Sequence, residues 1–331
     1  MPDNIRISIG TASLLGLVQC KLDALPTTAY TMTYVKTRCS ANCAFCAQAR
    51  ESEAKANQLS RVTWPSYPLD EVTVTLAETG TASPFRRLCI QTVCYPSLIT
   101  DLASLISEFK KIVPYIPISL ALPPLNANQL QALYDYGVDR VAISLDAVTP
   151  ELFDSIKGSN VHGPFTWNQH WRTLNIAQSI FGSHRTTTHL IIGLGETEQQ
   201  TVFLIQELVN NGITIGLFPF TPIVGTPLEN HHRPSLGNYR RIQLAHYLLQ
   251  NHVITAADIR FNASRQITRF GLTREQLADV IARGKAFQTS GCPSCNRPFF
   301  TETPRGPLYN YPFPPSDEAL QEIKFQLTGV L

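Results

Sequence analysis

Hydrophobic and polar positions along the chain follow two alternating periods, which predict a parallel β/α protein. Short runs rich in β-branched, aromatic and other apolar residues predict buried strands. They lie at residues 29–38, 87–94, 115–122, 140–146, 186–196, 213–220 and 258–264. Apolar residues at helical spacing predict the helices between and after them. These lie at residues 68–79, 98–113, 127–137, 149–158, 198–212, 239–250 and 273–285.

Helix-end signals support this reading of the pattern. Thr149 suits the N-cap of the helix that contains Pro150 in its first turn and Glu151 behind it, and Gly137 is a stop signal for the helix before it. Regular alternation of strand and helix favours a TIM-type (β/α) barrel, complete or partial, over an open sheet. We expect the barrel at residues 30–290, with an N-terminal extension at 1–29 and a C-terminal extension at 291–331 that cap its mouth.

Composition and charge narrow the class of protein. The 331 residues carry a formal net charge of +2, so the chain is not a general polyanion binder, and no nucleic acid is expected as a partner. No apolar run reaches the roughly 20 residues that span a bilayer, and the first residues lack the order of a secretory signal. We therefore expect a cytoplasmic protein without a membrane partner. In that reducing compartment, its eight cysteines favour metal ligation or catalysis over disulfides.

Three of these cysteines form a compact motif directly after the first predicted barrel strand. In "CSANCAFC" the residues Cys39, Cys43 and Cys46 have C-x3-C-x2-C spacing, and the aromatic Phe45 precedes the third cysteine. Four thiolates normally complete the coordination of a [4Fe–4S] cluster. Three would leave one iron open to a further ligand, as a catalytic zinc site leaves one position open. A structural zinc site or three buried thiols is the alternative.

With this motif the chain resembles the radical SAM superfamily. The resemblance implies a [4Fe–4S] cluster on the three cysteines, with its open iron chelated by S-adenosylmethionine. It also implies that electron transfer yields a 5′-deoxyadenosyl radical that abstracts hydrogen. The cofactor then carries the chemistry, and the protein positions it and excludes solvent.

Further segments resemble the biotin synthase and lipoyl synthase branch of that superfamily. "ISLDAVT" is similar to the strand that touches the adenosyl ribose, with Asp146 retained and Ser144 where asparagine is usual. "LIIGLGET" is similar to the family's glycine-rich strand end, with His189 before it in place of a small residue. The resemblance implies that cofactor-binding residues lie in these segments and at the arginine of "IRFNASRQ". These are Phe45, Ser144, Asp146, Gly193, Gly195, Glu196 and Arg260.

The chain also departs from biotin synthase. That enzyme holds a [2Fe–2S] cluster with three cysteines and one arginine. Cys89 or Cys94 could supply one cysteine here, but "ISLALPP" has none and another position falls at Thr187. Two of the four ligands are therefore missing, and biotin synthase activity is not expected.

A second cysteine pair lies near the end of the chain, where Cys292 and Cys295 form a C-x-x-C knuckle within a proline-rich stretch. Such a knuckle suits an iron–sulfur cluster or zinc. Two thiolates cannot hold a cluster alone, and we expect Cys20 from the N-terminal extension to be the third ligand of an auxiliary [4Fe–4S] cluster. Its fourth ligand is open, with Cys94, Ser290 and Ser294 as candidates. Structural zinc and redox or inert thiols are the alternatives.

The tail "GCPSCNRPFFTETPRGPLYNYP" is most similar to the subunits of the two-protein lipoyl synthase of archaea and some bacteria. This resemblance implies a sulfurtransferase that inserts sulfur into a C–H bond of a carrier-bound octanoyl chain. It implies three partners: an octanoylated lipoyl carrier domain or peptide, a sister subunit, and a low-potential donor such as ferredoxin or flavodoxin. The loop at 230–241, with two histidines and three arginines, would be either solvated or a docking edge for an acidic carrier. The competing hypotheses are another radical SAM enzyme, acting on a small metabolite or RNA, and a zinc-stapled binding protein.

Overall fold

A mostly parallel sheet forms the centre of the computed structural model, which describes residues 2–80 and 83–330. Its eight strands have the order β10-β9-β8-β7-β6-β2-β1-β5. Six of them are parallel neighbours. These are β2 (Thr28–Thr33), β6 (Arg87–Gln91), β7 (Ile118–Leu122), β8 (Arg140–Ile143), β9 (Thr186–Ile192) and β10 (Thr214–Pro219). At one edge β1 (Asn4–Ile7) pairs antiparallel with both β2 and β5 (Ser66–Pro68).

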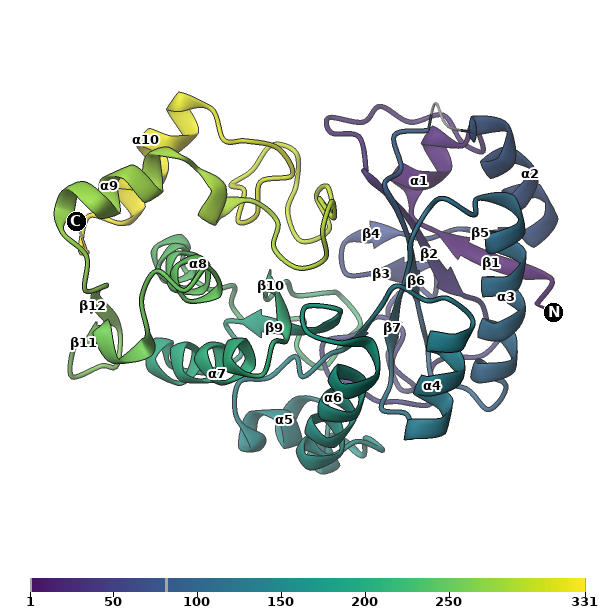
Figure 1. Cartoon of the computed structure of the whole chain (residues 1–331), viewed down its shortest axis with the longest axis horizontal. Helices are drawn as coiled ribbons and strands as arrows, with labels where there is room; N and C mark the ends of the chain where they lie inside the picture. The colour runs from purple at the N-terminus through teal and green to yellow at the C-terminus, as the bar shows by residue number, and fades with distance from the viewer. Residues whose placement is uncertain (1, 81–82, 331) are drawn as a thin grey trace.

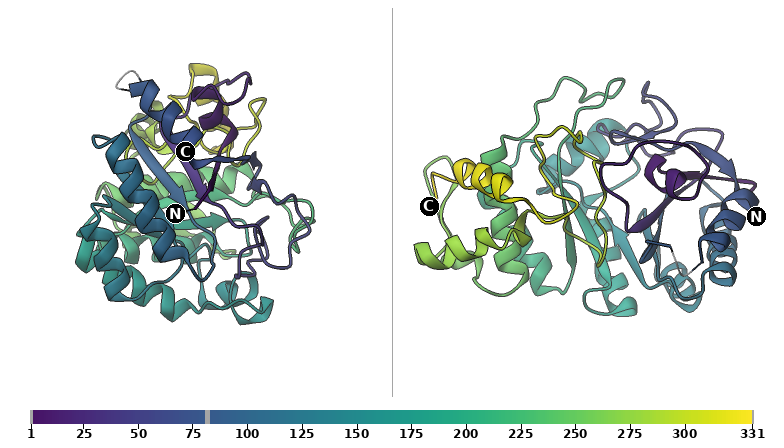
Figure 2. Two further views of the ribbon diagram at one scale, coloured as in Figure 1. Left: turned by 90° about the vertical axis from the view of Figure 1, so that its right-hand side faces the viewer. Right: turned by 90° about the horizontal axis from the view of Figure 1, so that it is seen from above.

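Helices cover the outer face of the curved sheet, as Figures 1 and 2 show. The helices nearest the sheet are α1 (Ile9–Leu14), α2 (Leu69–Thr79), α3 (Leu98–Ile112), α4 (Ala127–Asp135), α5 (Pro150–Ile156), α6 (Trp167–Phe181), α7 (Glu198–Asn210) and α8 (Leu236–Gln250). Farther out, α9 (Arg274–Ala282) and α10 (Asp317–Gln326) pack against each other, and α10 packs against α8. Their apolar faces and the strands share one buried core. The expected N-cap of α5 is confirmed, because the Thr149 side chain accepts a hydrogen bond from the Leu152 amide at 3.3 Å. The predicted β/α alternation is therefore correct, and the fold is a TIM-type barrel that remains open on one side.

The strand predicted at residues 258–264 does not join the barrel. Only β11 (Arg260–Phe261) is extended there, and it pairs antiparallel with β12 (Ile267–Arg269) in a separate hairpin. The reversal follows at once: the Asn262 amide donates to the Gln266 carbonyl, and Arg265 has a φ of 59°. The tight turn returns the chain before a barrel strand can form. A shorter hairpin, β3 (Gln58–Leu59) with β4 (Val62–Thr63), follows the first cysteine motif.

Residues 289–302, here called the C-terminal segment, lie along the open side of the sheet between β10 and β2 (Figure 1). The edge amide of Leu217 in β10 donates to Ser290 Oγ at 2.8 Å. The amide of Arg297 donates to the hydroxyl of Tyr30 in β2 at 2.7 Å. Further along, the Thr301 carbonyl accepts a hydrogen bond from Thr221, just beyond β10. The segment thus fills the gap in the partial barrel instead of capping its mouth.

The close approach of this segment depends on a glycine in β10. A Cβ on Gly216 would lie 3.0 Å from the His189 ring and 3.2 Å from the Arg297 guanidinium. Both distances are tighter than ordinary van der Waals contact, so the glycine leaves room for the segment.

Candidate functional site

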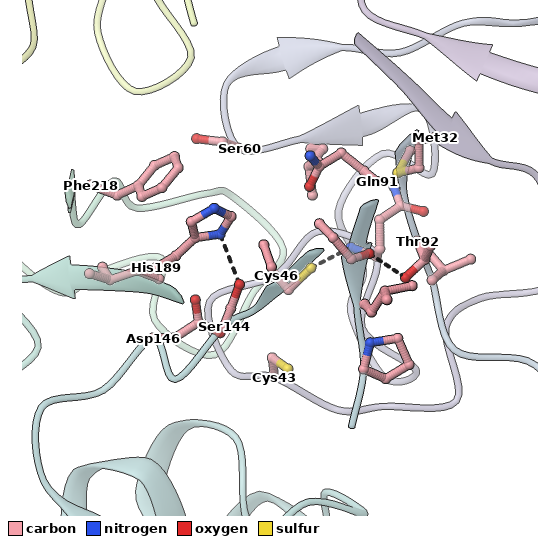
Figure 3. A pocket seen from close by; sticks show the side chains of 18 of the residues that line it. Met32, Cys43, Cys46, Ser60, Gln91, Thr92, Ser144, Asp146, His189 and Phe218 are labelled. Atoms are coloured by element: carbon pink, nitrogen blue, oxygen red, sulfur yellow. Dashed lines mark hydrogen bonds between the residues drawn. The ribbon is translucent and has the colours of Figure 1, made fainter. Parts of the chain in front are cut away.

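One cavity of about 300 Å³ lies inside the partial barrel, and seven of the eight cysteines line it. They are Cys39, Cys43, Cys46, Cys89, Cys94, Cys292 and Cys295. Figure 3 shows part of this cavity, with Cys43 and Cys46 facing the side chains at the ends of β8 and β9. The cysteines fall into two groups, which come from opposite ends of the strands.

The first group follows β2 at the carboxyl end of the sheet, where parallel β/α proteins place their sites. Turns hold the motif closed: the Cys46 amide donates to the Cys43 carbonyl at 3.0 Å, and the Cys39 amide donates to the Gln48 carbonyl at 3.1 Å. Two sulfurs accept backbone hydrogen bonds. The Cys94 amide lies 3.1 Å from Cys39 Sγ, and the Gln48 amide lies 3.4 Å from Cys46 Sγ. Amide donors aimed at sulfur are what cluster-bound thiolates require.

Burial and hydrogen bonding give the three thiols different acidities. Hydrogen bonds from Cys94, first from its thiol and then from its amide, lower the pKa of Cys39 to about 6 against the effect of burial. Burial raises the pKa of Cys43, and it raises the pKa of Cys46 to about 11. The same hydrogen bond to Cys39 raises the pKa of Cys94. Cys39 is thus the thiol most readily present as the metal-binding thiolate.

Phe45, Ser144 and Asp146, three of the predicted cofactor-binding residues, line the cavity beside this group. Asp146 follows β8 with a φ of 63°, and its carboxylate accepts a hydrogen bond from Lys157 Nζ at 2.6 Å. The same ammonium group donates to the Ser144 carbonyl at 2.6 Å. Lys157 itself is buried, and its ammonium lies close enough to the Cys43 thiol to lower the pKa of that thiol. The ion pair therefore places a buried ammonium group next to the cysteine motif together with the Asp146 carboxylate, which acts on the pKa of Cys43 in the opposite direction.

The glycine-rich loop after β9 does not line the cavity. Glu196 turns back on its own loop, where its carboxylate accepts hydrogen bonds from the amides of Gly193 at 2.6 Å and Leu194 at 2.9 Å. Gly193 and Gly195 both have positive φ, and a Cβ on Gly193 would lie 2.7 Å from Pro234. Gly193, Gly195 and Glu196 therefore shape the turn from β9 into α7. The glycine-rich sequence pattern is explained by this turn.

Two predicted ligands lie elsewhere. Cys20 is exposed in the loop between α1 and β2, where its carbonyl accepts a hydrogen bond from Ser13, and it does not line the cavity. The prediction that it joins Cys292 and Cys295 is therefore corrected. Arg260 is exposed on the β11–β12 hairpin and donates only to the nearby Ala257 carbonyl at 3.3 Å. Because that hairpin lies outside the barrel sheet, the arginine does not reach the cofactor region.

The second group contains Cys292 and Cys295 of the C-terminal segment, and Cys89 of β6 lies beside them. Cys295 Sγ lies 3.3 Å from the Tyr30 hydroxyl, and Cys292 Sγ lies 3.9 Å from Thr187 Oγ1. Burial raises the pKa of Cys89 to about 12, and the neighbouring Cys292 and Cys295 raise it further. Sequence reasoning named Cys89 only as a candidate for a cluster that lacks its other ligands. Its strand position gave no signal that a distant segment would fold against it.

His189 and Arg297 also line the cavity, although neither was among the predicted cofactor-binding or metal-binding residues. His189 of β9 forms a hydrogen bond of 2.8 Å with Ser144, and burial lowers its pKa to about 3, so the imidazole is neutral. The Arg297 guanidinium lies over the Phe218 ring, 4.0 Å from its centroid. The sequence signal for His189 was that a histidine is unusual before "LIIGLGET". The only sequence signal for Arg297 was its position two residues after Cys295 of the C-x-x-C pair.

Within residues 2–80 and 83–330, no three histidine, cysteine or acidic side chains are placed to hold a single metal ion. A [4Fe–4S] cluster has a different requirement, because each thiolate binds its own iron. Over the same residues, no helix is long and apolar enough to cross a membrane.

An α/β barrel with three cysteines after its first parallel strand defines a cluster-binding enzyme class. The radical SAM superfamily matches residues 33–208, more than half of the chain, and the chain belongs to this superfamily. Membership implies a [4Fe–4S] cluster that binds S-adenosylmethionine. The three thiols, their amide donors and the adjoining cavity fit that group.

Curated relatives are similar at low identity. Biotin synthase from Persephonella marina is 26% identical over 198 residues, which are 58% of this chain and 54% of that protein. GTP 3′,8-cyclase from Trichormus variabilis is 25% identical over 167 residues, 50% of this chain and 48% of that protein. The chain thus spans about half the length of these relatives.

Solved structures show the same fold. Methylornithine synthase (PylB) has a TM-score of 0.52 and 14% identity, covering 68% of this chain and 63% of that one. The FeFe-hydrogenase maturase HydG from Carboxydothermus hydrogenoformans also has a TM-score of 0.52, with 16% identity, and covers 69% of this chain and 52% of that one. The predicted radical SAM fold is therefore confirmed.

Proposed function

We propose that the protein is a radical SAM sulfurtransferase that inserts sulfur into an unactivated C–H bond of a carrier-bound octanoyl chain, as a component of a two-protein lipoyl synthase. The observation that carries the proposal is the single cavity with a cysteine group at each end. One group would hold the cluster that binds S-adenosylmethionine. The other would hold an auxiliary [4Fe–4S] cluster that donates sulfur.

The distance between the two groups suits a substrate lying between them. Cys94, whose amide contacts Cys39, follows Cys89 by five residues along β6 and the loop after it. At about 3.3 Å per residue, the two groups are separated by at most about 17 Å along the strand direction. That leaves space for the adenosyl group and an acyl chain.

The cavity wall between the cysteine groups is chemically suited to an alkyl chain. Apolar side chains dominate it, among them Leu122, Phe165, Ile191, Phe218, Phe220 and Phe300. Such a wall holds a saturated chain and excludes water from a radical. When bound, S-adenosylmethionine on its cluster would supply the hydrogen-abstracting radical and the auxiliary cluster would supply the sulfur, while the apolar wall would hold the alkyl chain between them.

The chain's own residues would orient the two bound groups. Lys157 would hold Asp146 and the end of β8 in place beside the S-adenosylmethionine site. The neutral His189 would fix the Ser144 hydroxyl at the middle of the cavity. Carrier domain, sister subunit and ferredoxin or flavodoxin are proposed partners on the same basis.

Another activity of the same branch is the second candidate, because the curated relatives include both biotin synthase and GTP 3′,8-cyclase. Polar side chains such as Ser144, His189 and Arg297 do line the cavity, but most of its accessible wall is aromatic and aliphatic. The apolar wall therefore favours the acyl substrate.

The test is anaerobic incubation of the reconstituted protein with an octanoyl-lysine peptide, S-adenosylmethionine and reductant, with and without the sister subunit. We expect a peptide product heavier by one sulfur atom and dependent on S-adenosylmethionine cleavage. Normal cleavage with an unmodified peptide in both arms would overturn the lipoyl assignment. A radical SAM enzyme with another substrate would then remain.

A further inference from the structure

We propose that Cys89 of β6 joins Cys292 and Cys295 as a ligand of the second cluster, and that loading this site fixes the C-terminal segment against the barrel. The inference rests on the proposed auxiliary cluster but not on the octanoyl substrate. It assigns the site to one thiol of β6 and to a pair of thiols that lies about 200 residues later in the sequence.

Strand pairing brings Cys89 to the two later cysteines. In the parallel register of β2 and β6, Cys89 is the partner of Tyr30. The hydroxyl of Tyr30 lies 3.3 Å from Cys295 Sγ and accepts a hydrogen bond from the Arg297 amide. Cys89 and Cys295 also pack against the same buried cluster around Tyr30. One tyrosine thus positions both the strand cysteine and the knuckle.

The knuckle itself is built to present two sulfurs on one side. The Cys295 amide donates to the Cys292 carbonyl at 3.1 Å in a tight turn, with Gly291 and Ser294 both at positive φ. The turn is tied to the amino ends of two strands, because Arg87 of β6 donates to the Pro293 carbonyl at 3.4 Å and Thr27 donates to the Ser294 carbonyl. It therefore enters the barrel at the end opposite the first cysteine motif.

Each of the three sulfurs has a polar hydrogen nearby. Gln91 Nε2 donates to Cys89 Sγ at 3.1 Å. The hydroxyls of Tyr30 and Thr187 lie beside Cys295 and Cys292, respectively. Two guanidinium groups also lie at the knuckle, because Arg87 donates to the Pro293 carbonyl and Arg297 donates to the Ser290 carbonyl at 2.9 Å. Such donors and cations stabilise anionic sulfur, and hydrogen bonds to sulfur tune iron–sulfur clusters.

Openness to the cavity favours an iron–sulfur cluster over structural zinc at this site. Structural zinc takes four protein ligands and is closed. Among the eight cysteines, all within the described residues, Cys39, Cys43, Cys46 and Cys94 lie in the other group and Cys20 lies outside. Only three thiolates are therefore available, and they face a cavity that can deliver a substrate.

The experiment removes the first cluster so that only the second site can bind iron. The background variant carries Cys39→Ala, Cys43→Ala and Cys46→Ala, and it is reconstituted anaerobically with iron and sulfide. We expect about four irons per chain, because a [4Fe–4S] cluster has iron at four of the eight corners of a cube. Adding Cys89→Ala or Cys295→Ala should remove most of this iron, while Cys20→Ala, the matched control, should leave it unchanged.

Two further measurements separate ligand loss from misfolding. Cys89→Ala in the otherwise unaltered chain should keep the iron of the first cluster and its S-adenosylmethionine cleavage. In hydrogen exchange, loading the background variant should slow exchange of the amides in the C-terminal segment, and Cys89→Ala should abolish that slowing. Three results would each overturn the proposal. They are iron retained when Cys89→Ala is added to the background variant, iron lost when Cys20→Ala is added to it, and zinc bound in place of iron. An intact second cluster with no sulfur addition to the peptide would instead overturn only the octanoyl substrate.

Discussion

Ser144 Oγ and His189 Nδ1 form a hydrogen bond of 2.8 Å across β8 and β9. They are the two positions at which these strands depart from the resembled pattern, and the structure shows that the departures contact each other. A serine is shorter than the usual asparagine, and the larger histidine next to it fills the space and fixes the hydroxyl. The two residues therefore act as a unit beside the expected S-adenosylmethionine site.

Breaking this pair is predicted to weaken S-adenosylmethionine binding to the reconstituted protein. Ser144→Ala and His189→Ala should each lower affinity by about fivefold, corresponding to one hydrogen bond of about 1 kcal/mol. The double variant should bind S-adenosylmethionine as tightly as the weaker-binding single variant, since both substitutions remove the same hydrogen bond. Ser119→Ala is the control, because that cavity serine donates to the Leu88 carbonyl instead. Additive losses, measured by calorimetric titration, would contradict coupling of the pair.

Removing the Lys157 ammonium group is predicted to destabilise the fold strongly. Lys157→Met leaves the buried Asp146 carboxylate without its partner, and loss of one member of a buried ion pair costs about 3–5 kcal/mol. Asp146→Asn should cost less, because the amide oxygen can still accept from the ammonium. Denaturant unfolding measures both changes. Lys111→Met is the control: it breaks an ion pair with an exposed lysine and should change the free energy of unfolding by less than about 1 kcal/mol. Equal effects of Lys157→Met and Lys111→Met on this free energy would contradict the prediction.

Cys94 is predicted to be dispensable for the first cluster. Its backbone amide donates to Cys39 Sγ at 3.1 Å, which any residue at this position supplies, so the substitution removes only the hydrogen bond of the thiol. Cys94→Ala should therefore retain the first cluster, whereas Cys39→Ala should lose it. Iron analysis and electron paramagnetic resonance of the reduced proteins distinguish these outcomes. Loss of the cluster in Cys94→Ala would make its thiol a ligand.

Stability is predicted to fall on acidification partly because of His246 in α8. Burial lowers its pKa to about 4 in the folded protein, whereas in the unfolded chain it is about 6.5. Between these values the unfolded state binds more protons, so this contribution is complete above pH 6.5 and is lost as pH falls toward 4. Denaturant unfolding at pH 7 and pH 5 should show that His246→Leu reduces the acid-induced loss by about 1–2 kcal/mol. An unchanged pH dependence would contradict a neutral buried imidazole.

The sequence predicted the features that depend on local pattern. Strand and helix periods gave the β/α order, and the spacing of Cys39, Cys43 and Cys46 gave the first site. It could not place β1, because four residues carry little periodic signal, and it missed α6 and α10. These elements are fixed by packing against distant parts of the chain.

The second site shows the limit most clearly. A third thiol near Cys292 and Cys295 was expected from chemistry, but local pattern could not choose between Cys20 and Cys89. That choice depends on the register of β6 with β2 and on the path of the C-terminal segment. Arg260 was misplaced for a related reason, because a strand-like composition at 258–264 did not reveal the turn after Phe261.

The most direct test of the central claim is the fate of sulfur carried by the protein. The chain is reconstituted with isotopically heavy sulfide, freed of unbound sulfide, and incubated with an octanoyl-lysine peptide, S-adenosylmethionine, reductant and the sister subunit. The account predicts a peptide bearing heavy sulfur, formed by the intact chain and lost in Cys295→Ala although S-adenosylmethionine is still cleaved. Peptide without added sulfur, or sulfur addition that persists in Cys295→Ala, would contradict it.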